Sequence, residues 1–155
     1  MPDDVRYAVE PNLTVAEFVD VLRRSTLAER RPVDDAVRIA TMLRQADIVA
    51  TARDAAGLLV GVARALTDFS YCTYLSDLAV DTAWQRRGVG RELLRRTHAA
   101  AGLDTTLILL AAPAAREYYP HVGLERHDSC WLVRSASSPA APQADPHGDK
   151  APHYQ

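Results

Sequence analysis

The feature that most constrains the fold is an apolar, strand-like segment that runs into a glycine-containing loop and then into an amphipathic helix. Residues 71–80 are rich in aromatic and aliphatic side chains, as expected of a β-strand. The loop Gln-Arg-Arg-Gly-Val-Gly spans residues 85–90. From about residue 88 to residue 101, apolar side chains recur on one face at helical spacing, and charged side chains occupy the other face. A strand joined to a helix by so short a loop indicates a layered α/β fold.

This strand-to-helix loop has the chemistry of an anion site. Gly88 and Gly90 allow backbone geometries, and close approaches of a ligand, that a Cβ atom would block. Because the first amides of a helix lack intrahelical partners, we expect the N–H groups of residues 88–91 to point outward, where the helix dipole also favours an anion. The cationic side chains that can reach a phosphate are Arg86, Arg87 and Arg91. The loop therefore predicts a binding site for a pyrophosphate.

The residues alone leave the identity of this phosphate-bearing ligand open. A Gly-x-Gly pair also occurs in ordinary strand-to-helix turns, so the loop by itself is weak evidence. The G-x-x-x-x-G-K-S/T loop of nucleoside triphosphatases is absent. The third glycine of a dinucleotide-binding loop, three residues beyond Gly90, is absent as well, together with its acidic partner. A protein that binds another nucleotide through this loop stays as an alternative.

Other periodic segments surround this unit. Strand character is expected at residues 5–9, 47–52, 58–66, 106–111 and 124–133. One helix begins at Thr14, which can form a capping box with Glu17, and a second begins at Asp34 or Asp35. Pro113 suits the first turn of a short later helix. The order strand, two helices, three strands, helix, strand, helix, strand predicts a mixed α/β sheet flanked by helices.

Composition predicts one folded domain followed by a tail. The 155 residues fit a single domain, and 48% of them are hydrophobic, which is enough for a full core. Residues 135–155 consist mainly of Ser, Ala, Pro and Asp, and they contain no Leu, Ile, Val, Met, Phe or Trp. We therefore expect a folded domain over residues 1–134 and a disordered tail over residues 135–155.

Charge and cysteine content argue against several classes of function. A net charge of −2 and a pI near 6.2 give no general field for binding a nucleic acid, although a local basic patch stays open. Cys72 and Cys130 form neither a C-x-x-C pair nor a cluster with histidine, so no metal site and no disulfide are expected. The N-terminus is acidic and no apolar run approaches about 18 residues, so we expect no membrane span and a cytoplasmic protein.

Two segments carry a resemblance to a known family. Residues 78–80, Leu-Ala-Val, followed after a short interval by the loop, resemble the acetyl-CoA signature Q/R-x-x-G-x-G/A of the GNAT superfamily of N-acetyltransferases. Residues 115–124, Ala-Arg-Glu-Tyr-Tyr-Pro-His-Val-Gly-Leu, are similar to the later A-x-x-F-Y-x-x-x-G-F pattern of this superfamily. Tyr118 replaces the usual Phe, and Leu124 replaces the last Phe. The likeness covers nearly the whole of residues 1–134.

The resemblance implies a fold, a reaction and a set of binding residues. The fold is a single-domain GNAT-like α/β fold, whose mixed, mostly antiparallel sheet has splayed central strands. The reaction is direct transfer of the acetyl group of acetyl-CoA to a primary amine of a small molecule or peptide. A non-catalytic acetyl-CoA-binding sensor is the alternative, and a homodimer is compatible with the resemblance. The residues expected to hold acetyl-CoA are Leu78, Ala79, Val80, Gln85, Arg86, Arg87, Gly88, Val89, Gly90 and Arg91.

Two side chains are candidates for the chemistry. Tyr119 matches the family tyrosine beside the sulfur, and a phenol with a reference pKa of about 10 can protonate the departing thiolate at pH 7. Asp77 immediately precedes residues 78–80, and it could deprotonate the amine directly or through water, anchor the amine, or be structural. Strict alternation places Asp77 on the face of Leu75, unless a bulge resets the phase. A main-chain amide of the same strand would meet the oxyanion.

The acceptor is expected near the early helices. In the family this region forms much of the acceptor site, and here the connection between the two helices contains Arg30 and Arg31. These arginines could bind a carboxylate on the amine, or they could form a solvated turn. Asp68, Tyr71 and Tyr74 could line the same side and form a mildly aromatic, acidic pocket for a small primary amine.

Overall fold

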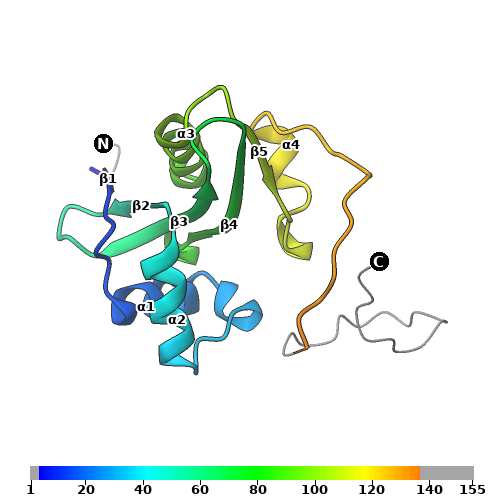
Figure 1. The fold of residues 1–155 in the computed structure, drawn as a ribbon. Helices are drawn as coiled ribbons and strands as arrows, with labels where there is room; N and C mark the ends of the chain where they lie inside the picture. Colours follow the sequence, from blue (N-terminus) through cyan, green and yellow to red (C-terminus); the bar gives the residue numbers. More distant parts are fainter. Residues whose placement is uncertain (1–3, 137–155) are drawn as a thin grey trace.

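Five strands form one sheet in the computed structural model, which describes residues 4–136 (Figure 1). They are β1 Arg6–Val9, β2 Ile48–Arg53, β3 Leu59–Thr67, β4 Cys72–Val80 and β5 Thr106–Leu109. The strands follow chain order across the sheet, and all neighbours are antiparallel except for the parallel β4–β5 pair. The α-helices are α1 Val15–Arg24, α2 Ala36–Gln45, α3 Val89–Ala101 and α4 Tyr118–His121, and the 3₁₀ turns are η1 Leu27–Arg30, η2 Thr82–Trp84 and η3 Pro113–Ala115. The predicted mixed, mostly antiparallel sheet is confirmed.

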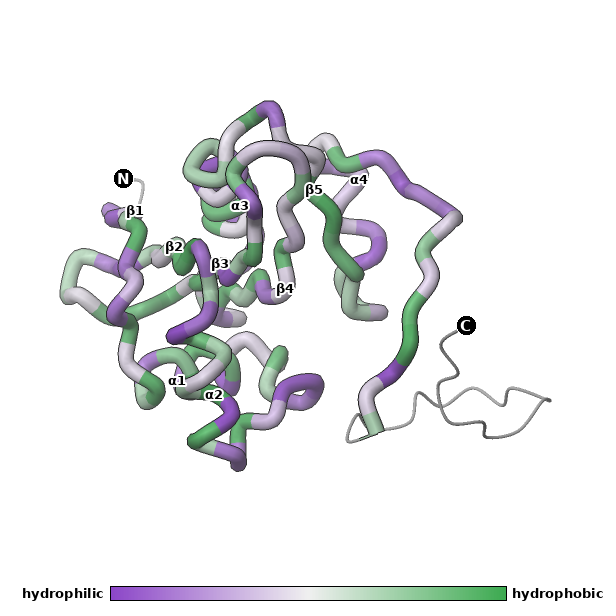
Figure 2. The backbone as a smooth tube through the Cα atoms, viewed as in Figure 1, coloured by the Kyte–Doolittle hydropathy of each residue, from purple (hydrophilic) through white to green (hydrophobic). Residues whose placement is uncertain are grey.

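Helices cover both faces of the sheet, with α3 on one face and α1 and α2 on the other (Figure 1). Leu93 of α3 is buried with Ala50 and Ala63 in the core on its face. Phe18 of α1 and Ile39 of α2 are buried in the core on the opposite face. The central strands β2 and β3 are therefore enclosed on both sides, which explains why nearly all of their residues are buried and why their sequences are mainly apolar (Figure 2).

The first two helices begin where their capping residues predict. Oγ1 of Thr14 accepts a hydrogen bond from the N–H of Glu17 at 3.2 Å, and Oδ1 of Asp35 accepts one from the N–H of Arg38 at 3.0 Å. The Thr14 hydroxyl also donates to the carboxylate of Glu17 at 3.1 Å. The N-cap of α2 at Asp35 fixes one end of the connection 25–35, which carries η1 and Arg31.

The parallel pairing of β4 with β5 covers only half of β4. Residues Cys72 to Leu75 pair with Thr106 to Leu109, and there the pairing ends. The other edge of β4 stays paired with β3 as far as Val80. Beyond Leu75 the two strands diverge, as the V shape of β4 and β5 in Figure 1 shows. The predicted splay is confirmed, and within residues 4–136 no strand pairs with the main chain of residues 76–80 on the β5 side.

A β-bulge lies at the point where β4 leaves β5. Arg64 of β3 pairs with Asp77 and the next residue, Ala65, pairs with Leu75, so that Ser76 is an extra residue in β4. The bulge resets the alternation: Leu75 belongs to the core under α3, whereas Ala79 belongs to the core under α1 and α2. Asp77, two residues before Ala79, therefore faces the α1 and α2 side. Strict alternation with Leu75 is wrong for this strand.

The final strand predicted at residues 124–133 does not form. Residues 124–136 contain neither helix nor strand, and Figure 1 shows this segment running apart from β5. Trp131 is 92% exposed, and Leu132 and Val133 are exposed as well. High β-propensity needs a hydrogen-bonded neighbour and a surface to pack against, and the described chain supplies neither here. Of the tail predicted at residues 135–155, residues 137–155 lie outside the described residues.

Candidate active site

The loop between β4 and α3 presents the start of the helix to solvent. Gly88 is the N-cap of α3 and has a left-handed φ of 84°, and among residues 4–136 no atom beyond its chain neighbours lies within 4 Å of the position that a Cβ atom would occupy. The first helical bond of α3 runs from the N–H of Glu92 to the oxygen of Gly88 at 3.0 Å, so the amides of residues 89–91 precede it. These amides and the helix dipole favour an anion at this point, as the sequence predicts.

The side chains of this loop fasten it to its surroundings. Nε2 of Gln85 donates to the main-chain oxygen of Val80 at 3.1 Å, which ties the loop to the end of β4. The guanidinium of Arg87 lies 5.0 Å from the ring centre of Trp84. Arg86 has a left-handed φ of 61°, which the sequence did not predict for a residue with a Cβ atom. Arg91 donates to the main-chain oxygen of His121 at 3.2 Å and thereby joins α3 to α4.

Gly90 brings the two sequence motifs together. A Cβ atom at Gly90 would lie 2.8 Å from the hydroxyl of Tyr118 and 3.6 Å from Cγ2 of Val80. The end of β4, the first turn of α3 and the first residue of α4 therefore meet at one point. The rings of Tyr118 and Tyr119 are 5.4 Å apart in an edge-to-face arrangement, which places the predicted acid beside this point.

Tyr119 is held as a neutral phenol. Burial raises its pKa above the usual value of 10.0, and the neighbouring Tyr118 raises it further. The positive charge of the Arg31 guanidinium opposes this by lowering the pKa of Tyr119. Turn hydrogen bonds fix the peptide of Tyr119, whose oxygen accepts from the amides of Val122 and Leu124 at 3.1 Å each. A protonated phenol in a fixed position can act as a general acid.

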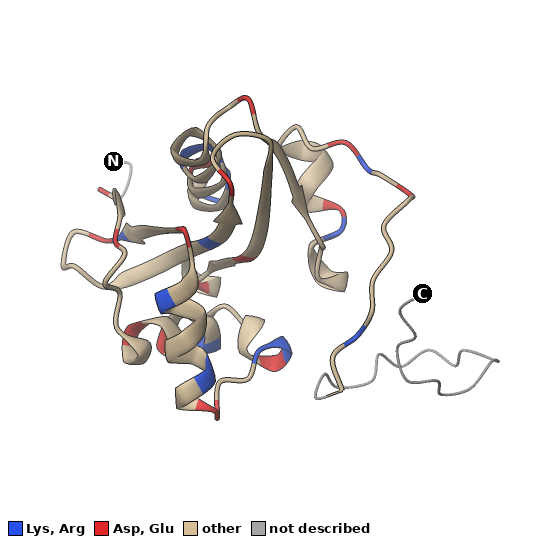
Figure 3. Ribbon diagram, viewed as in Figure 1, with Lys and Arg blue, Asp and Glu red and all other residues tan. Residues whose placement is uncertain are grey.

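Asp77 is wholly buried and paired with two arginines. Few charged residues interrupt the sheet, and most lie on helices and turns (Figure 3). Asp77 is 0% exposed, its Oδ1 accepts from Nε of Arg31, and its Oδ2 accepts from Nε of Arg64. Both carboxylate oxygens are thus engaged. This geometry favours the structural interpretation of Asp77 over the catalytic one, both of which the sequence left open.

Of the two arginines of this cluster, the sequence suggested Arg31 only as a residue that binds a carboxylate on the amine or as part of a solvated turn, and it did not suggest Arg64. Arg31 turns inward to Asp77 and is not part of a solvated turn, whereas Arg30 is exposed. Arg64 is 7% exposed and lies in the otherwise apolar strand β3. A lone charge inside an apolar strand needs a buried partner, and that is the signal that could have found Arg64.

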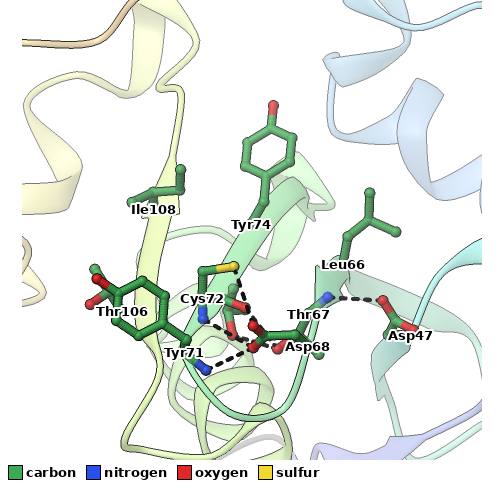
Figure 4. A pocket seen from close by; sticks show the side chains of 10 residues that line it. Asp47, Leu66, Thr67, Asp68, Tyr71, Cys72, Tyr74, Thr106 and Ile108 are labelled. Atoms are coloured by element: carbon green, nitrogen blue, oxygen red, sulfur yellow. Dashed lines mark hydrogen bonds between the residues drawn. The ribbon is translucent and has the colours of Figure 1, made fainter.

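An open hollow of about 700 Å³ lies at the beginning of β4 (Figure 4). Asp68, Tyr71 and Tyr74, the three residues expected on the acceptor side, all line it. The sequence missed its remaining lining residues, which are Asp47, Leu66, Thr67, Cys72, Thr73, Thr106 and Ile108. The cross-strand row of Leu66, Tyr74 and Ile108 follows from the β3–β4–β5 register.

Asp68 supplies a fixed negative charge at the rim of this hollow. Its Oδ1 accepts hydrogen bonds from the amides of Ser70, Tyr71 and Cys72 at 2.9, 2.7 and 3.1 Å. These bonds lower the pKa of Asp68 to about 2, so its carboxylate is ionised at neutral pH. The hollow therefore combines an apolar wall with an anionic rim.

The sequence predicted neither a metal site nor a membrane-spanning helix, and both features can be examined within residues 4–136. No group of three or more His, Cys, Asp or Glu side chains in this range could hold a metal ion. No helix in the same range is long and apolar enough to cross a membrane.

Comparison with known proteins places the sequence motifs in a family. A family model of the acetyltransferase (GNAT) domain matches residues 45–125, more than half of the chain. This span contains the loop, α3 and both tyrosines of α4. Comparison with curated proteins gave no match.

Solved structures share the fold over most of the chain. A candidate acetyltransferase of Deinococcus radiodurans R1 is 23% identical, with coverage of 84% of this chain and 89% of that chain and a TM-score of 0.68. A GNAT-family acetyltransferase of Streptococcus pneumoniae TIGR4 is 15% identical, with coverage of 85% and 100% and a TM-score of 0.65. The aminoglycoside N-acetyltransferase AAC(6′)-Iy, solved in complex with CoA, is 18% identical, with coverage of 88% and 97% and a TM-score of 0.65. With the fold shared and the family model matched, the chain belongs to the GNAT acetyltransferase family.

Proposed function

We propose that this protein is an acetyl-CoA-dependent N-acetyltransferase that acts on a primary amine of a small molecule or peptide. The observation that carries the proposal is the divergence of β4 from β5 after Leu75, beside the open amides at the start of α3 and the phenol of Tyr119. Unpaired strand amides suit an extended, amide-bearing arm, and the helix start suits a pyrophosphate. Acetyl-CoA carries both groups.

The residues proposed to hold acetyl-CoA form two groups. The main chain of Leu78, Ala79 and Val80 lies beyond the last β4–β5 pair, where those of its N–H and C=O groups that bond neither β3 nor Gln85 can bond the pantetheine arm. The pyrophosphate would be held by the loop and the first turn of α3, that is, by Gln85, Arg86, Arg87, Gly88, Val89, Gly90 and Arg91. The open space around Gly88 fits this ligand, because an anion can approach the amides closely there.

The proposed reaction is a direct transfer. The neutral amine attacks the thioester carbonyl, the C–N bond forms, and the developing oxyanion is stabilised by a main-chain amide of β4 near Leu78. The C–S bond then breaks, and Tyr119 gives its phenolic proton to the departing thiolate. Tyr119 recovers a proton from solvent. The products are the N-acetylated amine and CoA, and the proton lost by the amine balances the one that Tyr119 regains.

We propose that Asp77 shapes this site and does not itself deprotonate the amine. Both of its oxygens accept hydrogen bonds from guanidinium groups, so neither is free to take the proton of an ammonium. Water is then the acceptor of that proton. The rate is expected to rise with pH until the amine is neutral.

The acceptor is proposed to bind in the hollow at the beginning of β4. The ionised Asp68 at its rim suits a cationic amine, and the row formed by Leu66, Tyr74 and Ile108 suits an apolar or ring-shaped body. The AAC(6′)-Iy neighbour is an aminoglycoside N-acetyltransferase, and another structural neighbour is an aminoglycoside acetyltransferase solved with sisomicin. Polyamines and aminoglycosides therefore belong in any panel of acceptors.

The test is release of CoA from acetyl-CoA by the purified protein in the presence of amino acids, polyamines, aminoglycosides and peptide amines. We expect turnover with at least one class of primary amine, and mass spectrometry of the product should show one added acetyl group. Acetyl-CoA binding without turnover on any amine would favour the sensor. Stabilisation by ATP or NAD equal to that by acetyl-CoA would favour the nucleotide-binding alternative.

A further inference from the structure

Arg31 makes a fork of contacts to the β4 bulge. Its Nε donates to Oδ1 of Asp77, and its Nη2 donates to the main-chain oxygen of Ser76 at 2.7 Å. Its Nη1 donates to the main-chain oxygen of Arg30 at 2.8 Å, which orients the guanidinium within its own loop. One side chain from the α1–α2 connection thus binds both residues of the bulge, one through its main chain and one through its carboxylate.

Arg64 holds the same bulge from the neighbouring strand β3. Its Nε donates to Oδ2 of Asp77, and its Nη2 donates to Oγ of Ser76 at 3.0 Å. The side chains of Arg31, Arg64 and Asp77 are 21%, 8% and 0% exposed. A buried charge without its partner is costly, so the three side chains hold one another in a single arrangement. This arrangement carries one net positive charge.

The position of the bulge links these contacts to the site. The bulge follows Leu75, the last residue of β4 that pairs with β5, and it precedes residues 78–80, the main chain proposed to contact acetyl-CoA. The charge of Arg31 also acts on the phenol of Tyr119. Arg31 therefore links the α1–α2 connection, to which it belongs, with the half of β4 that has left β5, and its charge acts on the proposed acid.

We propose that Arg31 is a positioning residue for acetyl transfer, which fixes the Ser76–Asp77 bulge and thereby orients the main-chain amides that follow it. The inference rests on the proposed function, because it assigns those amides to the thioester. A displacement of about 1 Å at a reacting centre can cost about a hundredfold in rate. A loosened bulge should therefore impair catalysis more than it impairs binding of acetyl-CoA, since the pyrophosphate loop is untouched.

Arg53 provides a matched control far from the bulge. Its side chain is 20% exposed, pairs with Glu10 and Glu17, and donates to the main-chain oxygen of Gly57 at 3.0 Å. Like Arg31, it therefore joins carboxylate and carbonyl partners at the edge of the core. Lysine at either position keeps the charge but loses the planar fork.

The experiment compares Arg31→Lys with Arg53→Lys. We expect both variants to lower the melting temperature, and only Arg31→Lys to lower kcat, by about tenfold to a hundredfold, with little change in KM for acetyl-CoA. In Arg31→Ala, millimolar guanidinium should restore part of kcat, and it should restore none in Arg53→Ala. Unchanged kcat in Arg31→Lys, or an equal loss in Arg53→Lys, would overturn the proposal.

Amide hydrogen exchange of a peptide covering residues 76–80 gives a readout that does not need turnover. Loss of the Arg31 contacts should speed exchange in this peptide, and loss of the Arg53 contacts should not. If the wild-type protein binds acetyl-CoA but acetylates no amine, the proposed function fails while this comparison still decides the role of Arg31. Equal protection in Arg31→Lys and wild type would show that the guanidinium does not hold the bulge.

Discussion

The hydroxyl of Tyr118 lies 2.8 Å from the position that a Cβ atom on Gly90 would occupy. Gly90 has an ordinary helical conformation in the first turn of α3, so the glycine is required by space and not by φ. Its neighbour in the loop, Gly88, differs, because it has a left-handed φ of 84° and open space around it. The two glycines of the loop thus serve different purposes, and each purpose gives its own test.

Replacement of Gly90 by alanine should depend on what occupies residue 118. In the wild-type background, Gly90→Ala forces the Tyr118 hydroxyl to move, and we expect overpacking to cost about 1–3 kcal/mol of unfolding free energy. In a Tyr118→Phe background that hydroxyl is gone, so the higher helix propensity of alanine should make the change neutral or stabilising by up to about 1 kcal/mol. Urea denaturation of the four proteins measures both effects. An equal loss in both backgrounds would contradict the steric explanation.

Replacement of Gly88 by glutamate should abolish binding of acetyl-CoA. The new carboxylate would stand before the amides of α3, where the pyrophosphate is proposed to bind. Gly57→Glu is the control for backbone strain, because Gly57 has a φ of 90° and lies on the β2–β3 turn. We expect acetyl-CoA to raise the melting temperature of Gly57→Glu but not that of Gly88→Glu. Retained stabilisation of Gly88→Glu would remove the loop from the site.

Removal of the Tyr119 hydroxyl should lower kcat and change its pH dependence. We expect Tyr119→Phe to lose about a hundredfold or more in kcat, the usual contribution of a general acid. Because burial raises the pKa of Tyr119 above 10.0, the phenol stays protonated at neutral pH, and kcat of the wild type should fall only as pH rises through this elevated pKa. That alkaline decline should be missing in Tyr119→Phe.

The control for Tyr119 is Tyr118→Phe. Tyr118 is the other phenol at the site, and burial raises its pKa as well, so its ionisation must be separated from that of Tyr119. The charge of Arg31 lowers the pKa of Tyr119, and Arg31 is intact in both variants. We expect Tyr118→Phe to keep the alkaline decline of kcat. The rates should be measured with an acceptor of low amine pKa, so that its own deprotonation is complete before the decline begins.

Much of the fold could be predicted from the sequence because local signals agree with the tertiary structure. The glycine loop, the apolar stripe of α3, and the caps at Thr14 and Asp35 each specify a helix or a turn without distant information. The predicted strand at residues 124–133 failed for the opposite reason. A strand needs a neighbouring strand to pair with. A run of alternating or apolar residues does not indicate whether such a neighbour is within reach.

The site could be predicted only in part, because its geometry depends on the bulge. A single extra residue, Ser76, turns Asp77 to the α1 and α2 side of the sheet. Nothing in the local sequence marks this insertion, and the pairing of Asp77 with Arg31 and Arg64 spans 46 and 13 residues of sequence. Residues that match a family motif were recognisable. Arg64, and the pairing of Asp77 with both arginines, were not.

Replacement of Asp77 by asparagine separates the structural from the catalytic role. If Asp77 is the anion between two guanidinium groups, Asp77→Asn leaves the buried Arg64 and the half-buried Arg31 without their anion, and we expect a loss of about 3–5 kcal/mol in unfolding free energy. The control is Asp34→Asn, because the Asp34 carboxylate is 97% exposed and lies 3.7 Å from Arg23. That variant should change stability by less than about 0.5 kcal/mol. Urea denaturation measures both. A different outcome would return Asp77 to the role of general base. In that outcome, Asp77→Asn keeps the stability of the wild type, its kcat falls, and the increase of kcat with pH on the acid side is lost.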